Sequence, residues 1–127
     1  MAIRRKVSEA AGAAALAAVK QALCSTDPAP DFAALPRTVR ATGVRYLLEA
    51  LATLAPGNSV EVRVPPFGVT QCVAGPRHTR GTPPNVVEAD ALTWCQIALG
   101  FATWGEKAAL ISASGLRSDL NDYLPLF

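Results

Sequence analysis

The densest group of side chains that could do chemistry is the polar run Arg-His-Thr-Arg-Gly at residues 77–81. Arg77, His78 and Arg80 place several hydrogen-bond donors close together, which would suit a carboxylate, phosphate or sulfate group. A solvated turn between two strands is the plainer interpretation, because connecting segments are usually polar. His78 is the one histidine of the chain, and no candidate nucleophile stands at a motif spacing from it, so a catalytic base is not indicated.

Other catalytic and metal-binding patterns do not occur in the sequence. It contains no glycine-rich phosphate loop, no carboxylate pair at a useful spacing and no Ser/His/Asp or Cys/His arrangement. Cys24, Cys72 and Cys95 are far apart, lack CxxC spacing and cannot form a zinc site with a single histidine. We therefore expect no enzyme activity, no cofactor and no metal. Buried, reduced thiols in a cytoplasmic protein are expected instead.

Composition excludes several further classes of protein. A chain of 127 residues, of which 50% are hydrophobic, is expected to form one domain with its own core. The net charge of +2 favours neither a nucleic-acid binder nor a protein of membrane surfaces. No apolar run reaches the roughly 20 residues that a membrane span needs. A cleaved signal peptide is disfavoured because Glu9 interrupts the basic, alanine-rich start.

Two helices separated by a loop are predicted for the first part of the chain. The alanine-rich stretch 3–23, within an N-terminal unit 1–24, favours a helix. Prolines and aspartates over 25–35 indicate a loop. Residues 36–55 form the clearest amphipathic helix. Its apolar stripe is made by Val44, Leu47, Leu48, Leu51 and Leu54.

Alternation of apolar and polar residues predicts the strands of a sheet. Val60, Val62 and Val64 alternate with charged residues over 59–64, which is typical of a strand with one buried face. Residues 67–74 are predicted to form a second strand, close enough in sequence to pair antiparallel with the first. The residues expected to share one face of this second strand are Phe67, Val69, Gln71 and Val73. Short strands are also predicted at 85–88 and 111–114.

A well-buried helix is predicted to begin after Asp90 and to end at Gly100. Asp90 is a favourable N-cap residue, and glycine suits the left-handed conformation that stops a helix. Two adjacent apolar lines give this helix a wide face that should be buried. They comprise Leu92, Cys95 and Leu99 on one line, and Trp94, Ile97 and Phe101 on the other.

Two shorter helices are predicted after Gly100. Thr103 and Glu106 have the spacing of a capping box, which predicts a second helix over 104–110. Ser118 is expected to cap a closing helix that Pro125 ends. The apolar residues 126 and 127 are expected to dock against the domain.

The order of these elements resembles the sterol carrier protein-2 family over roughly residues 36–126. More narrowly, the stretches VEVRVPPFG and GPRHTRGTPPNVVE are similar to those of small actinobacterial sterol-carrier orthologues. The first helix and the proline-containing loop are not part of the usual family core. The residues that carry the wider resemblance are Asp90-Ala-Leu-Thr-Trp94, Leu99-Gly100, Trp104, Ala108-Ala109, Ile111-Ser-Ala-Ser-Gly115 and Leu120.

The resemblance implies an α+β fold in a single domain over 1–127, with its core at 36–127. It implies a mainly antiparallel sheet of about five strands, covered on one face by helices, and the fifth strand would have to come from dividing 67–79. It also implies an apolar cavity between sheet and helices that takes fatty acyl chains or sterols. The residues expected to line this cavity or to meet a head group at its mouth are Phe67, Val69, Trp94, Ile97, Phe101, Arg77, His78 and Arg80.

Two functions fit this resemblance. The first is a noncatalytic carrier of a hydrophobic small molecule such as a lipid, sterol or fatty acid. The second is a protein-interaction module with a filled core, because a similar fold occurs as the accessory domain of mycothiol-dependent isomerases. In that case the aromatic residues are ordinary core, as stripes at helical spacing usually are. Neither function requires nucleic acid or stable membrane insertion, and the oligomeric state and the role of the first helix stay open at this point.

Overall fold

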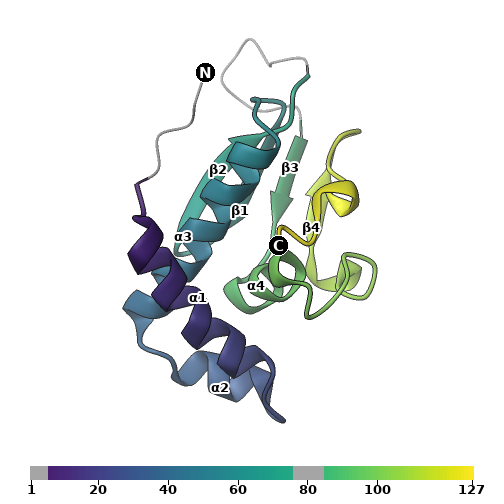
Figure 1. The fold of residues 1–127 in the computed structure, drawn as a ribbon. Coiled ribbons are helices and arrows are strands. Elements are labelled where there is room, and N and C mark those ends of the chain that lie inside the picture. Colours follow the sequence, from purple (N-terminus) through teal and green to yellow (C-terminus); the bar gives the residue numbers. More distant parts are fainter. Residues whose placement is uncertain (1–5, 76–84) are drawn as a thin grey trace.

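The computed structural model describes residues 6–75 and 85–127. These residues form an α+β fold in which helices pack on a single sheet, as predicted (Figure 1). The elements, in chain order, are α1 (Glu9–Leu23), α2 (Pro28–Ala34), α3 (Arg37–Leu54), β1 (Val60–Val64), β2 (Gly68–Cys72), β3 (Asn85–Glu88), α4 (Ala91–Leu99), the 3-10 turn η1 (Ala108–Leu110), β4 (Ser112–Ser114) and the 3-10 turn η2 (Asn121–Tyr123). Within the described ranges, no helix combines the length and hydropathy required to cross a membrane.

The sheet has four strands in the order β2-β1-β3-β4. Strands β1 and β2 pair antiparallel, as do β3 and β4, while β1 and β3 run parallel. The sheet is therefore mainly antiparallel, but the expectation of about five strands is not met in the described part of the chain. The extra strand would have come from dividing 67–79. Instead, β2 is one strand over Gly68–Cys72, and residues 76–79 lie outside the described ranges.

Strand register decides which side chains face the helices. Val60, Val62 and Val64 are buried, as the alternation predicted, and Gly68, Thr70 and Cys72 of β2 pair with them. Since paired residues share a face of the sheet, the intervening residues of β2 face outward. The expected common face for the odd-numbered residues of β2 is therefore wrong: Val69 is 59% exposed, although Phe67 and Val73 are buried.

The error at β2 arises because both ends of the predicted strand belong to turns. The amide of Phe67 donates to the carbonyl of Val64 at 2.9 Å, which closes the turn between β1 and β2. Val73 has φ +64, a left-handed conformation that is strained for a β-branched residue. Its carbonyl accepts from the Ser59 amide at 3.1 Å and from the Ser59 hydroxyl at 2.7 Å. The alternation of inward and outward side chains is therefore confined to Gly68–Cys72 and includes neither Phe67 nor Val73.

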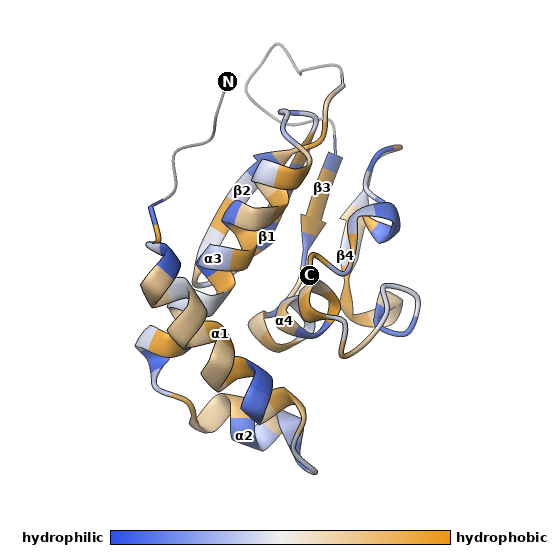
Figure 2. Ribbon diagram, in the orientation of Figure 1, coloured by the Kyte–Doolittle hydropathy of each residue, from blue (hydrophilic) through white to orange (hydrophobic). Residues whose placement is uncertain are grey.

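Helix α3 lies along the sheet over β1 and β2 (Figure 1). Four members of its predicted stripe, Val44, Leu47, Leu48 and Leu51, are buried. The fifth, Leu54, is 58% exposed, because the helix ends there and the chain turns away; Ala55 is buried instead. Figure 2 shows apolar colours along the middle of β3 and over most of α1.

The N-terminal segment differs from its prediction in two places. Helix α1 begins at Glu9 and not at residue 3, because Ser8 caps it by accepting from the Ala11 amide at 3.1 Å; residues 1–5 lie outside the described ranges. Residues 28–34, predicted as part of a loop, form α2. Proline fits a first helical turn, whose amides need no acceptor within the helix, and Phe32, buried to 4% exposure, fastens α2 to the core.

Signals at the start and end of α4 are confirmed. The Asp90 carboxylate accepts from the Thr93 amide at 2.8 Å, and Gly100 ends the helix at φ +83. The capping box also forms: Thr103 N donates to Glu106 Oε1 at 2.9 Å, and Glu106 N donates to Thr103 Oγ1 at 3.1 Å. Hydrogen bonding of the Glu106 carboxyl, first with the Thr103 amide and then with the Thr103 side chain, lowers the pKa of that carboxyl.

The two short helices predicted after Gly100 are not α-helices. The capping box is followed by turns and η1. In residues 116–127, all of which the structure describes, η2 is the one regular element. Ser118 donates to the Gly115 carbonyl at 2.8 Å and caps no helix. Segments this short gain too few hydrogen bonds to offset helix nucleation. The apolar end docks in part: Leu126 N donates to Ala98 O at 2.8 Å, whereas Phe127 is 64% exposed.

Candidate functional site

A hollow lies at the β2 edge of the sheet because the inward positions there are small. Gly68 pairs with Val64 and supplies no side chain beneath Leu48 of α3. A Cβ added to Gly68 would lie 3.1 Å from Leu48 Cδ1, so the missing side chain would point into this space. The resulting cavity has a volume of about 520 Å³ and is open to solvent on part of its surface. Small-molecule sites in proteins have volumes of roughly 300–1,000 Å³.

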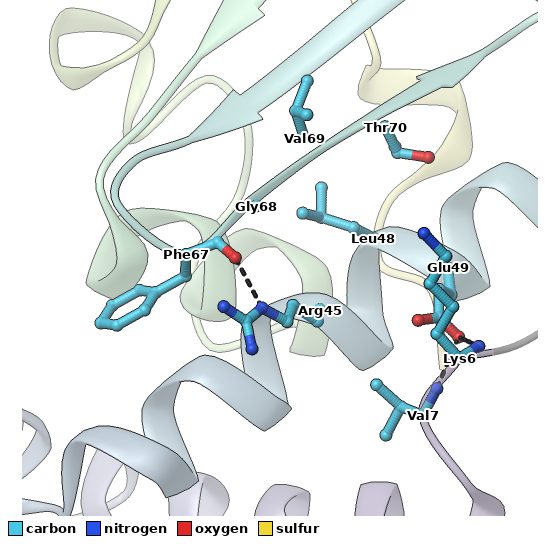
Figure 3. A pocket seen from close by; sticks show the side chains of 9 residues that line it. All are labelled: Lys6, Val7, Arg45, Leu48, Glu49, Phe67, Gly68, Val69 and Thr70. Carbon is cyan, nitrogen blue, oxygen red and sulfur yellow. Dashed lines mark hydrogen bonds between the residues drawn. The ribbon is translucent and has the colours of Figure 1, made fainter.

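Three separate segments enclose this cavity, as Figure 3 shows. Helix α3 provides its floor, and the β1–β2 turn with β2 provides one wall. The residues that precede α1 form the opposite wall. The lining consists of Arg45, Leu48 and Glu49 from α3, Phe67, Gly68, Val69 and Thr70 from the turn and β2, and Lys6 and Val7.

Phe67 organises the end of the cavity that lies near the start of α3. Its ring is buried, and the guanidinium carbons of Arg37 and Arg40 lie 5.1 and 5.8 Å from the ring centroid. Such cation–π contacts hold an aromatic ring in a defined place. The Phe67 carbonyl accepts from Arg45 Nε at 2.7 Å, which fixes that guanidinium at the cavity (Figure 3).

The opposite end of the cavity is closed by the backbone before α1. Oε1 of Glu49 accepts from the amide of Lys6 at 3.0 Å and from the amide of Val7 at 3.3 Å. Val7 is half-buried and packs against the core. The lining therefore carries two cationic side chains, Lys6 and Arg45, and one carboxylate, Glu49. This excess of positive charge favours an anionic group on a ligand.

The residues predicted to line an apolar cavity between the sheet and the helices are divided among different places. Phe67 and Val69 belong to the cavity at β2, although Val69 stands on the outward side of its strand. Trp94 and Ile97 are 1% and 2% exposed; Trp94 Nε1 donates to the Val44 carbonyl at 3.4 Å. Phe101 is 42% exposed, beyond the end of α4. These residues are therefore not brought together around one space.

The remaining predicted residues lie at a smaller cavity or outside the described ranges. Ile97 also lines a cavity of about 140 Å³ under the C-terminal segment, together with Trp104 and Pro125. Arg77, His78 and Arg80 lie outside the described residues, so their role at a head group stays a prediction.

Of the cavity lining, the sequence predicted only Phe67 and Val69; the residues missed are Lys6, Val7, Arg45, Leu48, Glu49, Gly68 and Thr70. Arg45 and Glu49 lie outside the apolar stripe predicted for residues 36–55, and Leu48 belongs to that stripe. A signal did exist, because glycine within a strand often marks a place where the backbone is approached closely. Gly68, directly after the turn, is such a position, but its inward orientation follows from pairing with β1 and is not apparent in the sequence.

The thiols lie outside this cavity. All three cysteines are free, as expected, but Cys24 is exposed and only Cys72 and Cys95 are buried. Burial raises the pKa of Cys72 to about 11, and burial together with the nearby Asp90 carboxylate raises the pKa of Cys95 to about 12. Both thiols are therefore protonated and poor nucleophiles near neutral pH. In the part of the chain that the structure describes, no cluster of His, Cys, Asp and Glu could hold a metal ion.

Comparison with known proteins gives one family. The model of a bacterial SCP ortholog matches residues 36–126. The matched range begins next to α3 and extends almost to the C-terminus, so α1 and α2 lie outside it. A comparison with curated proteins gives no match.

Proposed function

The chain belongs to the family of bacterial SCP orthologs, and from that premise we propose that it is a noncatalytic carrier whose ligand occupies the cavity at β2. The family indicates a lipid-binding carrier in general. For this chain we propose an acyl-chain lipid, a fatty acid or a sterol. The observation that carries the proposal is the cavity of about 520 Å³ between α3 and β2, with cationic side chains in its lining.

A ligand with a hydrocarbon part and an anionic head matches this lining best. The hydrocarbon would lie on Leu48 and against the backbone at Gly68, where no side chain intervenes. Each buried methylene group contributes roughly 0.8 kcal/mol, so a short stretch of chain is enough for useful affinity. The head would face Arg45 and Lys6, of which Arg45 is already held in place by the Phe67 carbonyl.

Probe displacement tests this proposal. Dansyl-labelled undecanoic acid should bind to the full chain with increased fluorescence, and unlabelled fatty acids should displace it. Gly68→Val should weaken binding by about tenfold or more, because the new methyl groups enter the cavity. The atoms nearest the new Cβ are Leu48 Cδ1 at 3.1 Å and Arg45 Cγ at 3.4 Å, both on flexible side chains, so the fold should persist. Gly105→Val is the matched control, since a Cβ there meets nothing within 4 Å.

The results separate binding at β2 from binding elsewhere. Equal probe affinity in the wild type and in Gly68→Val would place the lipid outside this cavity. Failure of the wild type to bind any probe, with no lipid found by native mass spectrometry after purification, would remove the carrier function itself.

A protein-interaction module is the second candidate, and exposed apolar side chains favour it. Leu110, Leu116 and Phe127 are 58%, 103% and 64% exposed. Under this alternative, Leu116→Ser would abolish capture of a stoichiometric partner and leave probe affinity unchanged. For either function we propose a cytoplasmic location, which the free cysteines support because oxidising compartments favour disulfides.

A further inference from the structure

The segment before α3 is firmly attached to the family core, although it lies outside the matched range. Gly12 of α1 stands against the ring of Tyr46, so closely that an added Cβ would lie 2.3 Å from Cδ1. The Tyr46 hydroxyl also donates to Glu9 Oε2 at 2.9 Å. Val19 of α1 is fully buried in the same core. These contacts fix the first turn of α1 beside the part of α3 that carries Glu49, one turn after Tyr46.

Residues 6 and 7, which we call the strap, are attached to α3 by hydrogen bonds from their backbone amides, in contrast to the side-chain contacts that hold α1. Both of their amides donate to the same oxygen, Oε1 of Glu49, at 3.0 and 3.3 Å. Ser8 follows the strap in an extended conformation, with ψ 154, and its side chain caps α1. The strap therefore joins a fixed helix at Ser8, and its hydrogen bonds to α3 go to one carboxylate, beside the packing of Val7 against the core. It forms one wall of the cavity.

We propose that the strap is a movable wall of the ligand cavity and that Glu49 is the positioning residue that holds it closed. The inference rests on the proposed function, because it concerns entry to that same cavity. When the two hydrogen bonds to Glu49 break, the strap rotates about Ser8 and moves away from the cavity. The amphiphile then enters or departs along the side of α3. Closure restores the half-buried position of Val7 against the core.

The carboxylate is suited to this role by its chemistry and its position. Hydrogen bonds to an ionised group are stronger than neutral ones, and here two backbone donors share one acceptor. Glu49 is half-buried and lies in the cavity lining, so its position is coupled to the ligand space. Because opening needs no change in α1 or α3, the rate of ligand exchange can vary without a change in the fold.

The test compares Glu49→Ala and Glu49→Gln with the wild type, and uses Glu88→Ala as control for loss of an exposed glutamate on the outward face of β3. Three quantities are measured on the full chain. They are hydrogen exchange of the amides of residues 6 and 7, the dissociation rate of dansyl-labelled undecanoic acid, and the rate at which a thiol reagent modifies Thr70→Cys. The last is carried out with Cys24→Ser, since Cys24 is exposed.

Glu49→Ala should raise amide exchange in the strap and probe dissociation by about tenfold each, the effect of losing a charge-assisted hydrogen bond. The Thr70→Cys thiol should react correspondingly faster. Glu49→Gln should fall between Glu49→Ala and the wild type, because its amide oxygen still accepts. Glu88→Ala should match the wild type in all three rates, and melting temperatures should agree within a few degrees.

Unchanged amide exchange in Glu49→Ala would overturn the proposal, and so would faster exchange without a faster thiol reaction or faster probe release. If the wild type binds no probe, the carrier function fails by itself. The thiol measurement then still decides: a faster reaction in Glu49→Ala supports a movable wall, and an equal rate overturns it.

Discussion

The two ends of the sheet's inner face have opposite character. At α4, Trp94 and Ile97 are almost completely buried, and the indole donates to the backbone of α3. At β2, Gly68 and Thr70 occupy the positions paired with Val64 and Val62, and a cavity of about 520 Å³ is present. The same helix, α3, contacts both ends. Trp94 therefore marks the filled end, and Gly68, the smallest residue, marks the hollow one.

This difference teaches that a hollow beside a sheet depends on side chains that are missing. Large apolar residues in a sequence indicate where a core will be filled, since protein interiors are packed about as densely as organic crystals. A ligand space arises where an inward position is small and its neighbours cannot move in. Here the turn at Phe67 and the rigid stripe of α3 prevent such a collapse, because both are held by contacts of their own.

The largest expected effect is in cysteine reactivity, which measures how tightly the α4 end is closed. Cys95 of α4 is fully buried with a pKa raised to about 12, whereas Cys24 is exposed. At pH 8, iodoacetamide should modify Cys95 at least about a thousandfold more slowly than Cys24, because Cys95 must wait for unfolding. Peptide mass spectrometry over time measures both rates. Similar rates would show that the α4 end opens readily.

Trp94→Ala should be the most destabilising single change at the filled end. Removing a fully buried indole leaves a void beside Val44 and should lower the free energy of unfolding by about 3–5 kcal/mol. Urea denaturation measures this difference. Phe101→Ala is the control, with an expected loss under about 1 kcal/mol, since that ring is 42% exposed. Comparable losses for the two variants would contradict a filled α4 end.

Thr70→Leu tests the hollow end by adding side-chain volume, whereas Trp94→Ala removes it. Thr70 is half-buried in the cavity lining, opposite Val62, so a larger apolar side chain there takes space from the ligand. We expect probe affinity to fall by roughly tenfold, while the unfolding free energy changes by less than about 1 kcal/mol. Titration with dansyl-labelled undecanoic acid and urea denaturation provide the two numbers. A large loss of stability would mean that the space is already filled.

Val69→Ser should have the smallest effect, and it checks the register of β2. Val69 is 59% exposed and pairs with Arg63 on the outward face, so its replacement should change the unfolding free energy by less than about 0.5 kcal/mol. Probe affinity should change by less than Thr70→Leu changes it. If Val69→Ser weakened binding more than Thr70→Leu did, the assignment of faces in β2 would be incorrect.

The parts of the fold that could be predicted are those with long periodicity or local hydrogen-bond chemistry. The stripe of α3, the alternation of β1 and the caps of α4 are of this kind. Proline misled the prediction at α2, because a helix tolerates it in the first turn. The capping box at Thr103 formed without a following α-helix, since a cap satisfies only the first amides and adds little propagation.

The site was predictable only in kind. The family resemblance led to an expected apolar space beside the sheet, but its position depends on strand register and on a contact between residues 6–7 and Glu49. Such contacts join parts of the chain that are remote in sequence, so no local sequence pattern predicts them. Of the aromatic residues predicted as lining, Phe67 does line the cavity, whereas Trp94 fills the core and Phe101 is exposed beyond α4.

The last strand has a consequence for handling the protein at high concentration. Strand β4 forms one edge of the sheet, comprises only Ser112–Ser114 and is exposed along its length. A long, flat, apolar edge would invite neighbouring molecules to stack into fibres, but a short serine-flanked edge offers them little to pair with. Copies of the chain are therefore not expected to associate by pairing along this edge of the sheet.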